Sequence, residues 1–195
     1  MKKILLLILF VSVATMGFAK KSYLSVISGN VSVLNQIDKT AIPEFDYSKT
    51  YIEGLPAIDY LTNHGGDYVK DWPEDNVVVA GYFFNAWNDV MKNRGLKLVK
   101  AGNADYRVVV HVDSLDLGST AGAMLGFSKT AGGCIICGTI DIVDCASDNV
   151  VCKLKVDKLK GDGAKFFDTG TNENRRRGLA YEKMAKQVVE LAKGK

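Results

Sequence analysis

Three stretches decide the fold: DYRVVVHVD (residues 105–113), CIICGTIDIVD (residues 134–144) and VVCKLKVD (residues 150–157). In the first, every second residue is apolar: Tyr106, Val108, Val110 and Val112. Between them lie polar residues such as Arg107 and His111. A period of two is typical of a strand with one buried face and one face in water. The other two stretches alternate in the same way, so together they predict the centre of a half-covered sheet.

A turn rich in Ser, Asp and Asn (residues 145–149) separates the second stretch from the third and predicts a β-hairpin. A tight turn would place Cys145 opposite Cys152, and we consider a disulfide between them. The alternation opposes this pairing, because Cys152 shares the parity of apolar Leu154 whereas Cys145 shares that of Asp141. A bulge would reconcile the two. Four cysteines permit three complete pairings, and buried thiols are the alternative.

Residues 1–19 predict a secretory signal peptide. Lys2 and Lys3 precede an apolar run (residues 4–14), and small residues stand before a cut at Lys20. The run is short for a membrane span of about 20 residues, so a cleaved signal is favoured over an anchor. No cysteine stands near the cut, and we therefore expect no lipid-anchored lipoprotein.

The chain after the cut, residues 20–195, is long enough for a single domain with its own core. The formal net charge of the full chain is +3, and basic side chains are concentrated after residue 152. Export leads us to expect no nucleic-acid partner, whereas an anionic membrane or polymer surface remains open. A solvated charged face is the simpler interpretation.

Shorter elements are expected in the first half of the chain. Residues 23–34 suggest a strand with a break or a small hairpin. Residues 41–53 suggest an edge or irregular strand, because Pro43 cannot donate a backbone hydrogen bond. A short helix is expected near residues 57–62, and a short strand at residues 96–99.

Two longer helices are predicted to pack on the sheet. The sequence Asp71-Trp72-Pro73-Glu74 predicts a helix start, because Asp71 can cap free N–H groups and Pro73 suits a first turn. Apolar residues then recur at helical spacing: Ala80, Phe83, Phe84, Trp87, Val90 and Met91. We expect this stripe to be core rather than a ligand box. The last helix is expected over residues 172–192, with a second stripe: Tyr181, Met184, Ala185, Val188, Leu191 and Ala192.

Arg175, Arg176 and Arg177 fall in the first turns of the last helix, where cations oppose the helix dipole. An anionic partner would relieve this mismatch, so the three residues are candidates for an anion contact. Three solvated arginines are the simpler interpretation. The polar, glycine-bearing segment before them (residues 160–172) is expected to loop outward.

The connection between the first two central strands, residues 117–133, combines glycines with small apolar residues. A phosphate cradle is not supported, because Lys129 and Thr130 precede the glycine pair instead of following it. Either this segment is a plain connection or it is an apolar loop that meets a partner or a membrane. Its candidate contact residues are Met124, Leu125 and Phe127.

No catalytic or metal-binding constellation is recognisable, and we predict no cofactor and no metal. The two histidines, His64 and His111, are far apart. Cys134 and Cys137 have redox spacing but lie at a predicted strand start, without the helix N-terminus that lowers a thiol pKa. A hydrolase would need a concave pocket that gathers carboxylates. The candidate carboxylates are Asp113, Asp116 and Asp141.

The order of elements resembles that of bacterial envelope families that share the α/β arrangement of the TolB N-terminal domain and of the curli-secretion protein CsgG. The resemblance covers residues 40–192 and rests on FDYSKTY (residues 45–51), ADYRVVV (residues 104–110) and GTIDIVD (residues 138–144). It implies a helix-backed mixed sheet and an envelope setting, and it carries over no catalytic residue. The lipoprotein cysteine expected of such families is absent.

We therefore predict an α+β fold with a single domain, whose mixed, mostly antiparallel sheet is packed by two main helices. The predicted role is an exported, non-enzymatic module in the periplasm, at the outer-membrane periphery or outside the cell. It would bind an envelope protein or assemble with itself. The alternatives are a membrane-associating assembly subunit and a hydrolase acting on an envelope polymer.

Overall fold

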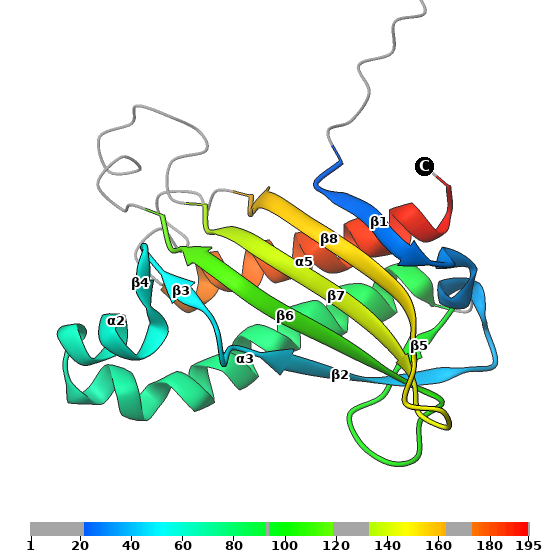
Figure 1. The fold of residues 1–195 in the computed structure, drawn as a ribbon, viewed down its shortest axis with the longest axis horizontal. Coiled ribbons are helices and arrows are strands. Elements are labelled where there is room, and N and C mark those ends of the chain that lie inside the picture. Colours follow the sequence, from blue (N-terminus) through cyan, green and yellow to red (C-terminus); the bar gives the residue numbers. More distant parts are fainter. Residues whose placement is uncertain (1–21, 93, 119–132, 163–172, 195) are drawn as a thin grey trace, which may run out of the picture.

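The computed structural model describes residues 22–92, 94–118, 133–162 and 173–194. One sheet and its helices make up this part of the chain (Figure 1). The elements are β1 (Leu24–Gly29), η1 (Val31–Asn35), β2 (Thr40–Asp46), β3 (Tyr51–Ile52), β4 (Leu55–Pro56), α2 (Ala57–His64), α3 (Gly66–Met91), β5 (Lys97–Leu98), β6 (Tyr106–Asp116), β7 (Ile135–Asp144), β8 (Val150–Lys160) and α5 (Glu173–Ala192).

The eight-stranded sheet has the order β1-β8-β7-β6-β2-β5, with β3 beside the end of β6 and β4 beside β3. Strands β6, β7 and β8, which the alternation predicted, form its antiparallel centre. Parallel pairing occurs between β2 and β6, β2 and β5, and β3 and β6. The predicted α+β fold with a mixed, mostly antiparallel sheet is confirmed.

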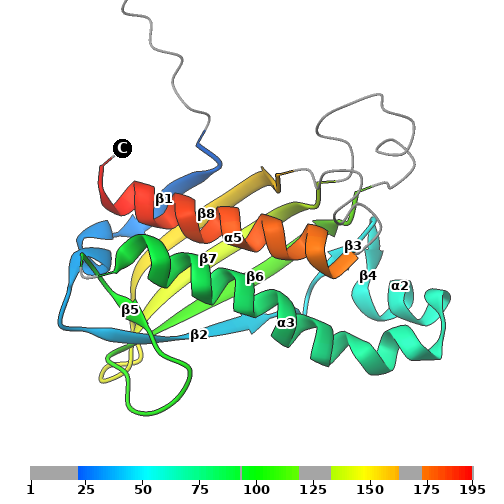
Figure 2. The ribbon, with the colours of Figure 1, turned by 180° about the vertical axis from the view of Figure 1, so that it is seen from behind.

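Helices α3 and α5 lie side by side across one face of the sheet (Figure 2). We call this the covered face. No described element lies over the other face, the open face, which is turned toward the viewer in Figure 1. The alternation of apolar and polar residues along β6 fits this asymmetry, because a strand directs successive side chains to opposite faces.

The core lies between the covered face and the two helices. Strands β6, β7 and β8 contribute buried side chains, among them Val108, Val110, Ile140, Ile142, Leu154 and Val156. The helices contribute Phe83, Trp87, Met91, Tyr181, Met184 and Val188. Each large apolar side chain stabilises the fold by about 1.5–3 kcal/mol when it is fully buried. Both predicted helix stripes are therefore core at these positions.

The prediction that a helix begins at Asp71 is wrong, because α3 begins at Gly66 and contains Pro73. Pro73 has no N–H to donate to the carbonyl of Val69, four residues earlier. The side chain of Val69 is exposed, so this part of the helix borders solvent. The first turns are supported by α2, which contacts α3 and buries Tyr60.

The remaining predictions for the first half of the chain agree with the structure except at residues 41–53, which form two strands, β2 and β3, instead of one. Residues 24–35 form β1 followed by a turn of 3₁₀ helix. Strand β5 pairs only with Thr40 and Ala41 of β2, so Pro43 lies on an unpaired edge. The short helix is α2 and the short strand is β5.

Some predictions fall outside the described residues: the signal peptide, most of the glycine-rich connection with Met124, Leu125 and Phe127, and the loop before α5. Among the described helices, none combines the length and the apolar character needed to cross a membrane.

Candidate functional site

A hollow of about 610 Å³ opens at the end of the molecule where α2 lies. It is surrounded by the segment after β2, by β3, β4 and α2, and by one residue of α3. Its lining consists of Tyr47, Ser48, Lys49, Thr50, Tyr51, Pro56, Ala57, Ile58, Leu61 and Trp72. The hollow is therefore mostly apolar and aromatic, with a few polar groups, as is usual for binding sites.

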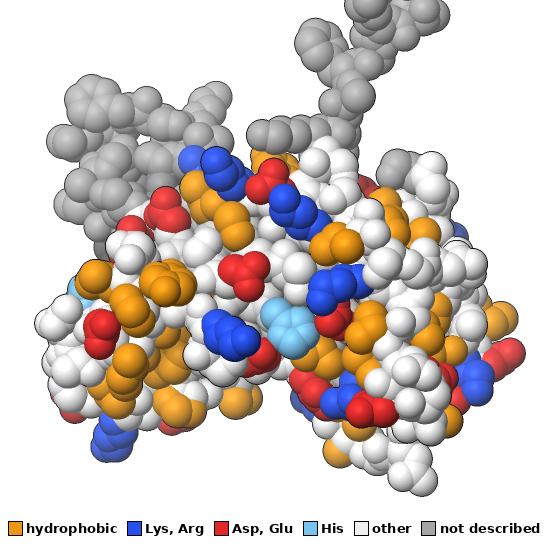
Figure 3. All heavy atoms as spheres, in the orientation of Figure 1, with side chains coloured by type: hydrophobic (Ala, Val, Ile, Leu, Met, Phe, Trp, Pro, Cys, Tyr) orange, Lys and Arg blue, Asp and Glu red, His pale blue; other side chains and the backbone are white. Residues whose placement is uncertain are grey.

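The rim of the hollow exposes large apolar side chains. Tyr51, Leu55 and Ile58 are 52%, 43% and 60% exposed. Tyr51 and Ile58 line the hollow, and Leu55 directly precedes its lining residue Pro56. Figure 3 shows hydrophobic side chains gathered over β3, β4 and α2 at this end of the molecule. We call the hollow together with these three residues the α2 surface.

Strands β3 and β4 bring the rim residues together through a tight turn. Glu53 and Gly54 both have positive φ, 50° and 81°, as a two-residue turn of type I′ requires. Thr50 fixes the base of this hairpin, because its hydroxyl donates to the carbonyl of Val112 at 2.6 Å. Ile52 is fully buried, so its neighbour Tyr51 must point outward.

A buried arginine supports the wall of the hollow. The guanidinium of Arg177 lies 4.0 Å from the centroid of the Trp72 ring. Arg177 is fully buried and donates to Asn76 and Asn174. Its Nε has no hydrogen-bond partner among the described residues. A desolvated cation over an indole face is attracted to it by about 2 kcal/mol, which fixes the orientation of Trp72.

The expectation of three solvated arginines is wrong for Arg176 and Arg177. Arg176 is also buried, and its Nε donates to the carbonyl of Leu117 at 2.8 Å. Arg175 donates to the hydroxyl of Tyr82 at 2.9 Å. The three side chains therefore reach three different neighbours. An anion contact at these residues stays a prediction.

Two tyrosines lie behind the same wall. The hydroxyls of Tyr47 and Tyr181 are 2.9 Å apart, and the Tyr47 ring meets Trp72 edge-on. Burial raises the pKa of Tyr47, and raises that of Tyr181 well above its ordinary value. Both hydroxyls therefore stay protonated at neutral pH.

The open face carries a second polar arrangement, which we call the open-face network. It crosses four strands: Asp46 of β2, His111 of β6, Asp141 of β7 and Lys153 of β8. His111 Nδ1 lies 3.0 Å from Asp46 Oδ2, and His111 Nε2 lies 3.5 Å from Asp141 Oδ2. Lys153 Nζ lies 3.1 Å from the same Asp141 oxygen.

The members of this network differ in their exposure to water. The side chain of Asp141 is 10% exposed, and its Oδ1 has no hydrogen-bond partner in the described part of the chain. The pKa of Asp46 is lowered to about 2, first by hydrogen bonds from Ser48 and then by His111. Ser48 and His111 together therefore keep Asp46 ionised down to about pH 2.

Sequence reasoning missed the open-face network. The alternation did place Arg107 and His111 of β6, and Asp141 of β7, on the polar parity. Strand order was the missing information, since β2 joins β6 in parallel from a distant part of the chain. The register pairs Asp46 directly with His111.

The carboxylates considered for hydrolysis lie on β6 and β7, away from the hollows formed by the described residues at α2, beside β2 and between α3 and α5. Asp116 accepts a hydrogen bond from the backbone N–H of Gly118 at 2.9 Å, and Asp113 is exposed. Asp141 belongs to the open-face network. The hollow at α2 is lined by none of the three.

The disulfide between Cys145 and Cys152 is not formed, and all four cysteines are free thiols. Cys152 is buried opposite Ile142, whereas Cys145 is exposed in the turn. The alternation had opposed this pairing for the same reason.

Burial raises the pKa of the Cys134 thiol to about 12, which is the opposite of what a redox thiol requires. The described residues contain no group of three or more acidic, His or Cys side chains that could hold a metal.

Comparison with known proteins finds weak structural similarity. No family model matches the sequence, and no curated protein matches it. A PelC dodecamer from Paraburkholderia phytofirmans is 12% identical, with a TM-score of 0.44, over 86% of this chain and 97% of that chain. A variant PelC dodecamer from the same organism is 13% identical, with a TM-score of 0.36, over 69% and 77%. Because both scores are below 0.5, the function of this chain is argued from its own residues.

Proposed function

We propose that this chain is an exported, non-enzymatic envelope module that binds a protein partner or a second copy of itself through the α2 surface. The observation that carries the proposal is the exposed apolar rim of Tyr51, Leu55 and Ile58 around a hollow of about 610 Å³. Contiguous exposed apolar surface of this kind marks interaction sites in soluble domains.

The shape of the α2 surface suits an inserted side chain. A rim of exposed apolar groups around a concavity is the arrangement in which a partner's anchor residue becomes fully desolvated. The wall is fixed before binding, because Trp72 is packed between Arg177 and Tyr47. A preformed wall reduces the entropy lost on association.

The envelope setting rests on the predicted signal peptide of residues 1–19 and on the resemblance to envelope families. A non-enzymatic role is supported by the chemistry of the hollow. The hydroxyl of Tyr47 has a raised pKa because it is buried, so it does not act as a base at neutral pH. The carboxylates Asp113, Asp116 and Asp141 lie outside the hollow.

The proposal is tested with the variant Ile58→Asp, made in the chain of residues 20–195. Ile37→Asp is the matched control, because Ile37 is exposed to the same extent, 59% against 60%, and lies away from the hollow. Sedimentation velocity measures self-association, and cross-linking in envelope extract measures capture of a partner. We expect Ile58→Asp to weaken association about tenfold or more, with the control unchanged.

Equal association of wild type, Ile58→Asp and Ile37→Asp would contradict a role of the α2 surface. Circular dichroism confirms that the variants are folded. Vesicles of anionic phospholipid are the third arm of the same test. Vesicle binding that is lost when Met124, Leu125 and Phe127 are all changed to Ser would instead favour the membrane-associating alternative.

A further inference from the structure

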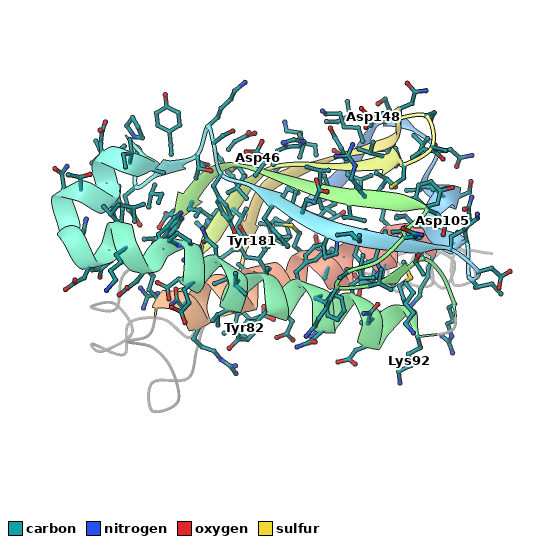
Figure 4. The ribbon with its side chains drawn as sticks, turned by 90° about the horizontal axis from the view of Figure 1, so that it is seen from below. Asp46, Tyr82, Lys92, Asp105, Asp148 and Tyr181 are labelled. Carbon is teal, nitrogen blue, oxygen red and sulfur yellow. The ribbon has the colours of Figure 1, made fainter. Side chains whose placement is uncertain are left out.

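A second hollow, of about 470 Å³, runs between β2 and α3. We call it the edge groove. Its lining consists of Pro43, Phe45, Val77, Ala80, Gly81, Phe84, Asn85 and Lys100. Figure 4 looks at the molecule from this side, where β2 and α3 run next to each other. It is separate from the α2 surface, since the two hollows share no lining residue.

One wall of the edge groove is an unpaired strand edge. β5 pairs only with Thr40 and Ala41 of β2, so no strand of the described residues lies beside the outer edge of β2 from residue 42 onward. The carbonyl of Ala41 accepts from the N–H of Val99 on the outer side, whereas that of Thr40 accepts on the β6 side. The direction of the backbone hydrogen-bonding groups alternates from residue to residue along a strand. Those of Pro43 and Phe45 therefore point outward, as the carbonyl of Ala41 does.

The other wall of the edge groove contains a glycine that no contact within the described part of the chain requires. Gly81 lies in the middle of α3, where glycine is less favourable than alanine. A Cβ at this position would meet no atom within 4 Å. The missing side chain therefore enlarges the groove without serving a contact inside the described chain.

One end of the edge groove carries a cation. Lys100 is the only charged residue in the lining. Its ammonium lies 5.7 Å from the centroid of the Phe84 ring. Lys100 has no ion pair among the described residues. Its position two residues after β5 places it at the Pro43 end of the unpaired edge.

We propose that the edge groove binds the free C-terminus of an extended peptide, which adds to β2 as an antiparallel strand. In such a pair, one peptide residue exchanges two backbone hydrogen bonds with Phe45, and the residue two positions later lies opposite Pro43. Pro43 has a carbonyl but no N–H. The carbonyl of Pro43 can therefore accept from the N–H of that peptide residue. The carbonyl of the peptide residue finds no donor, because Pro43 has no N–H.

A terminal carboxylate resolves the mismatch at Pro43. If the peptide ends opposite Pro43, its last carbonyl belongs to a carboxylate, which Lys100 can bind at that end of the edge groove. Capture of a C-terminal carboxylate and addition to a strand edge are both recurrent modes of peptide recognition. An internal peptide segment would instead leave a polar group unsatisfied.

The side chains of the bound peptide are also specified. Directly paired residues on neighbouring strands point to the same face of a sheet. The last and the third-last residues of the peptide would therefore point toward α3, as Pro43 and Phe45 do, and fill the space over Gly81. The ligand is thus a C-terminus with apolar residues at these two positions. This inference does not rest on the function proposed for the α2 surface.

The test uses a mixture of heptapeptides with a free C-terminus and Val, Ile, Leu or Phe at the last and third-last positions. The same mixture with an amidated C-terminus is the control ligand. Chemical-shift changes in the ¹⁵N-labelled chain of residues 20–195 locate the bound peptide. We expect the free-acid mixture to shift the amides of Phe45 and Gly81, and amidation to weaken binding about tenfold or more.

Two variants test the two ends of the edge groove. Gly81→Leu fills the space in a helix that accepts leucine well, and Lys100→Glu reverses the charge. Each should reduce binding about tenfold or more, whereas Lys97→Glu, outside the lining, should not. Absence of binding, equal binding of both mixtures, or binding unchanged by Gly81→Leu would each overturn the proposal. Ile58→Asp should leave peptide binding intact, which separates this result from the test of the α2 surface.

Discussion

The two faces of the sheet share the same strands but meet different surroundings. On the covered face, residues such as Val110, Ile140 and Leu154 pack against two helices. On the open face, Lys153 forms an ion pair with Asp141 within the sheet itself, and His111 lies beside the same carboxylate. The open face therefore carries polar and charged side chains that can face water without a covering layer.

The comparison also shows where contact surfaces remain. Charged side chains on exposed parts of a sheet oppose unwanted association. Exposed apolar side chains occur at the margins of the sheet, among them those of the α2 surface and of the edge groove. Both binding sites proposed above therefore lie at the margins and not on the charged open face.

The largest expected difference between the faces appears at two adjacent positions of β7. Ile140 is fully buried, whereas Thr139 lies on the open face opposite His111. Ile140→Ala should lower the free energy of unfolding by about 2–5 kcal/mol, and Thr139→Ala by about 0.5 kcal/mol or less. Urea denaturation measures both. Similar losses at the two positions would show that the faces are not distinct.

A smaller effect is expected within the open-face network. Asp141→Asn preserves the shape of the side chain but removes the charge that Lys153 and His111 contact. We expect a loss of about 1–2 kcal/mol in the free energy of unfolding. Lys153→Met and the double variant complete a cycle whose coupling energy measures the pair. A coupling energy near zero would show that the network is incidental.

The smallest effect is expected in the dependence of the free energy of unfolding on pH. The pKa of Asp46 is about 2 in the fold, against an ordinary value of 3.8, so folding favours its ionised form. Its contribution is present above about pH 4 and is lost as the pH falls from about 4 to about 2. The side chain is 41% exposed, and solvent screening reduces the contribution below about 1 kcal/mol.

Asp46→Asn removes this contribution. The stability difference between wild type and Asp46→Asn should therefore disappear between about pH 4 and about pH 2. Urea denaturation at a series of pH values follows it. A difference that stays constant over this range would mean that Asp46 acts through something other than its charge.

Side-chain periodicity predicted the buried side correctly in strands and helices that have one face in the core and one in water. The alternation of residues 105–113 predicted the buried parity of β6, and the helical spacing of Phe83, Trp87 and Met91 predicted the core side of α3. Prediction was less successful for the boundary of α3, which depends on the neighbouring helix α2. Asp71 and Pro73 resemble a helix start, yet α2 supports earlier turns and the helix begins at Gly66.

The second wrong prediction was that charged side chains at the start of the last helix are exposed to solvent. Arg176 and Arg177 follow one another in a polar sequence, and arginines in such a run are normally solvated. In the fold, an indole ring and backbone or amide oxygens replace water around them. Those partners come from segments about 60 to 100 residues away, which no local pattern reveals.

The sequence by itself determined the strand pattern, the terminal helix and the parity of the core, because burial depends on side-chain periodicity along each element. Tertiary structure alone decided that both long helices cover the same face, that β2 inserts beside β6, and that Asp46 meets His111. These arrangements depend on which surfaces pack against one another over long separations in the chain. The same long-range packing left the α2 surface and the edge groove open.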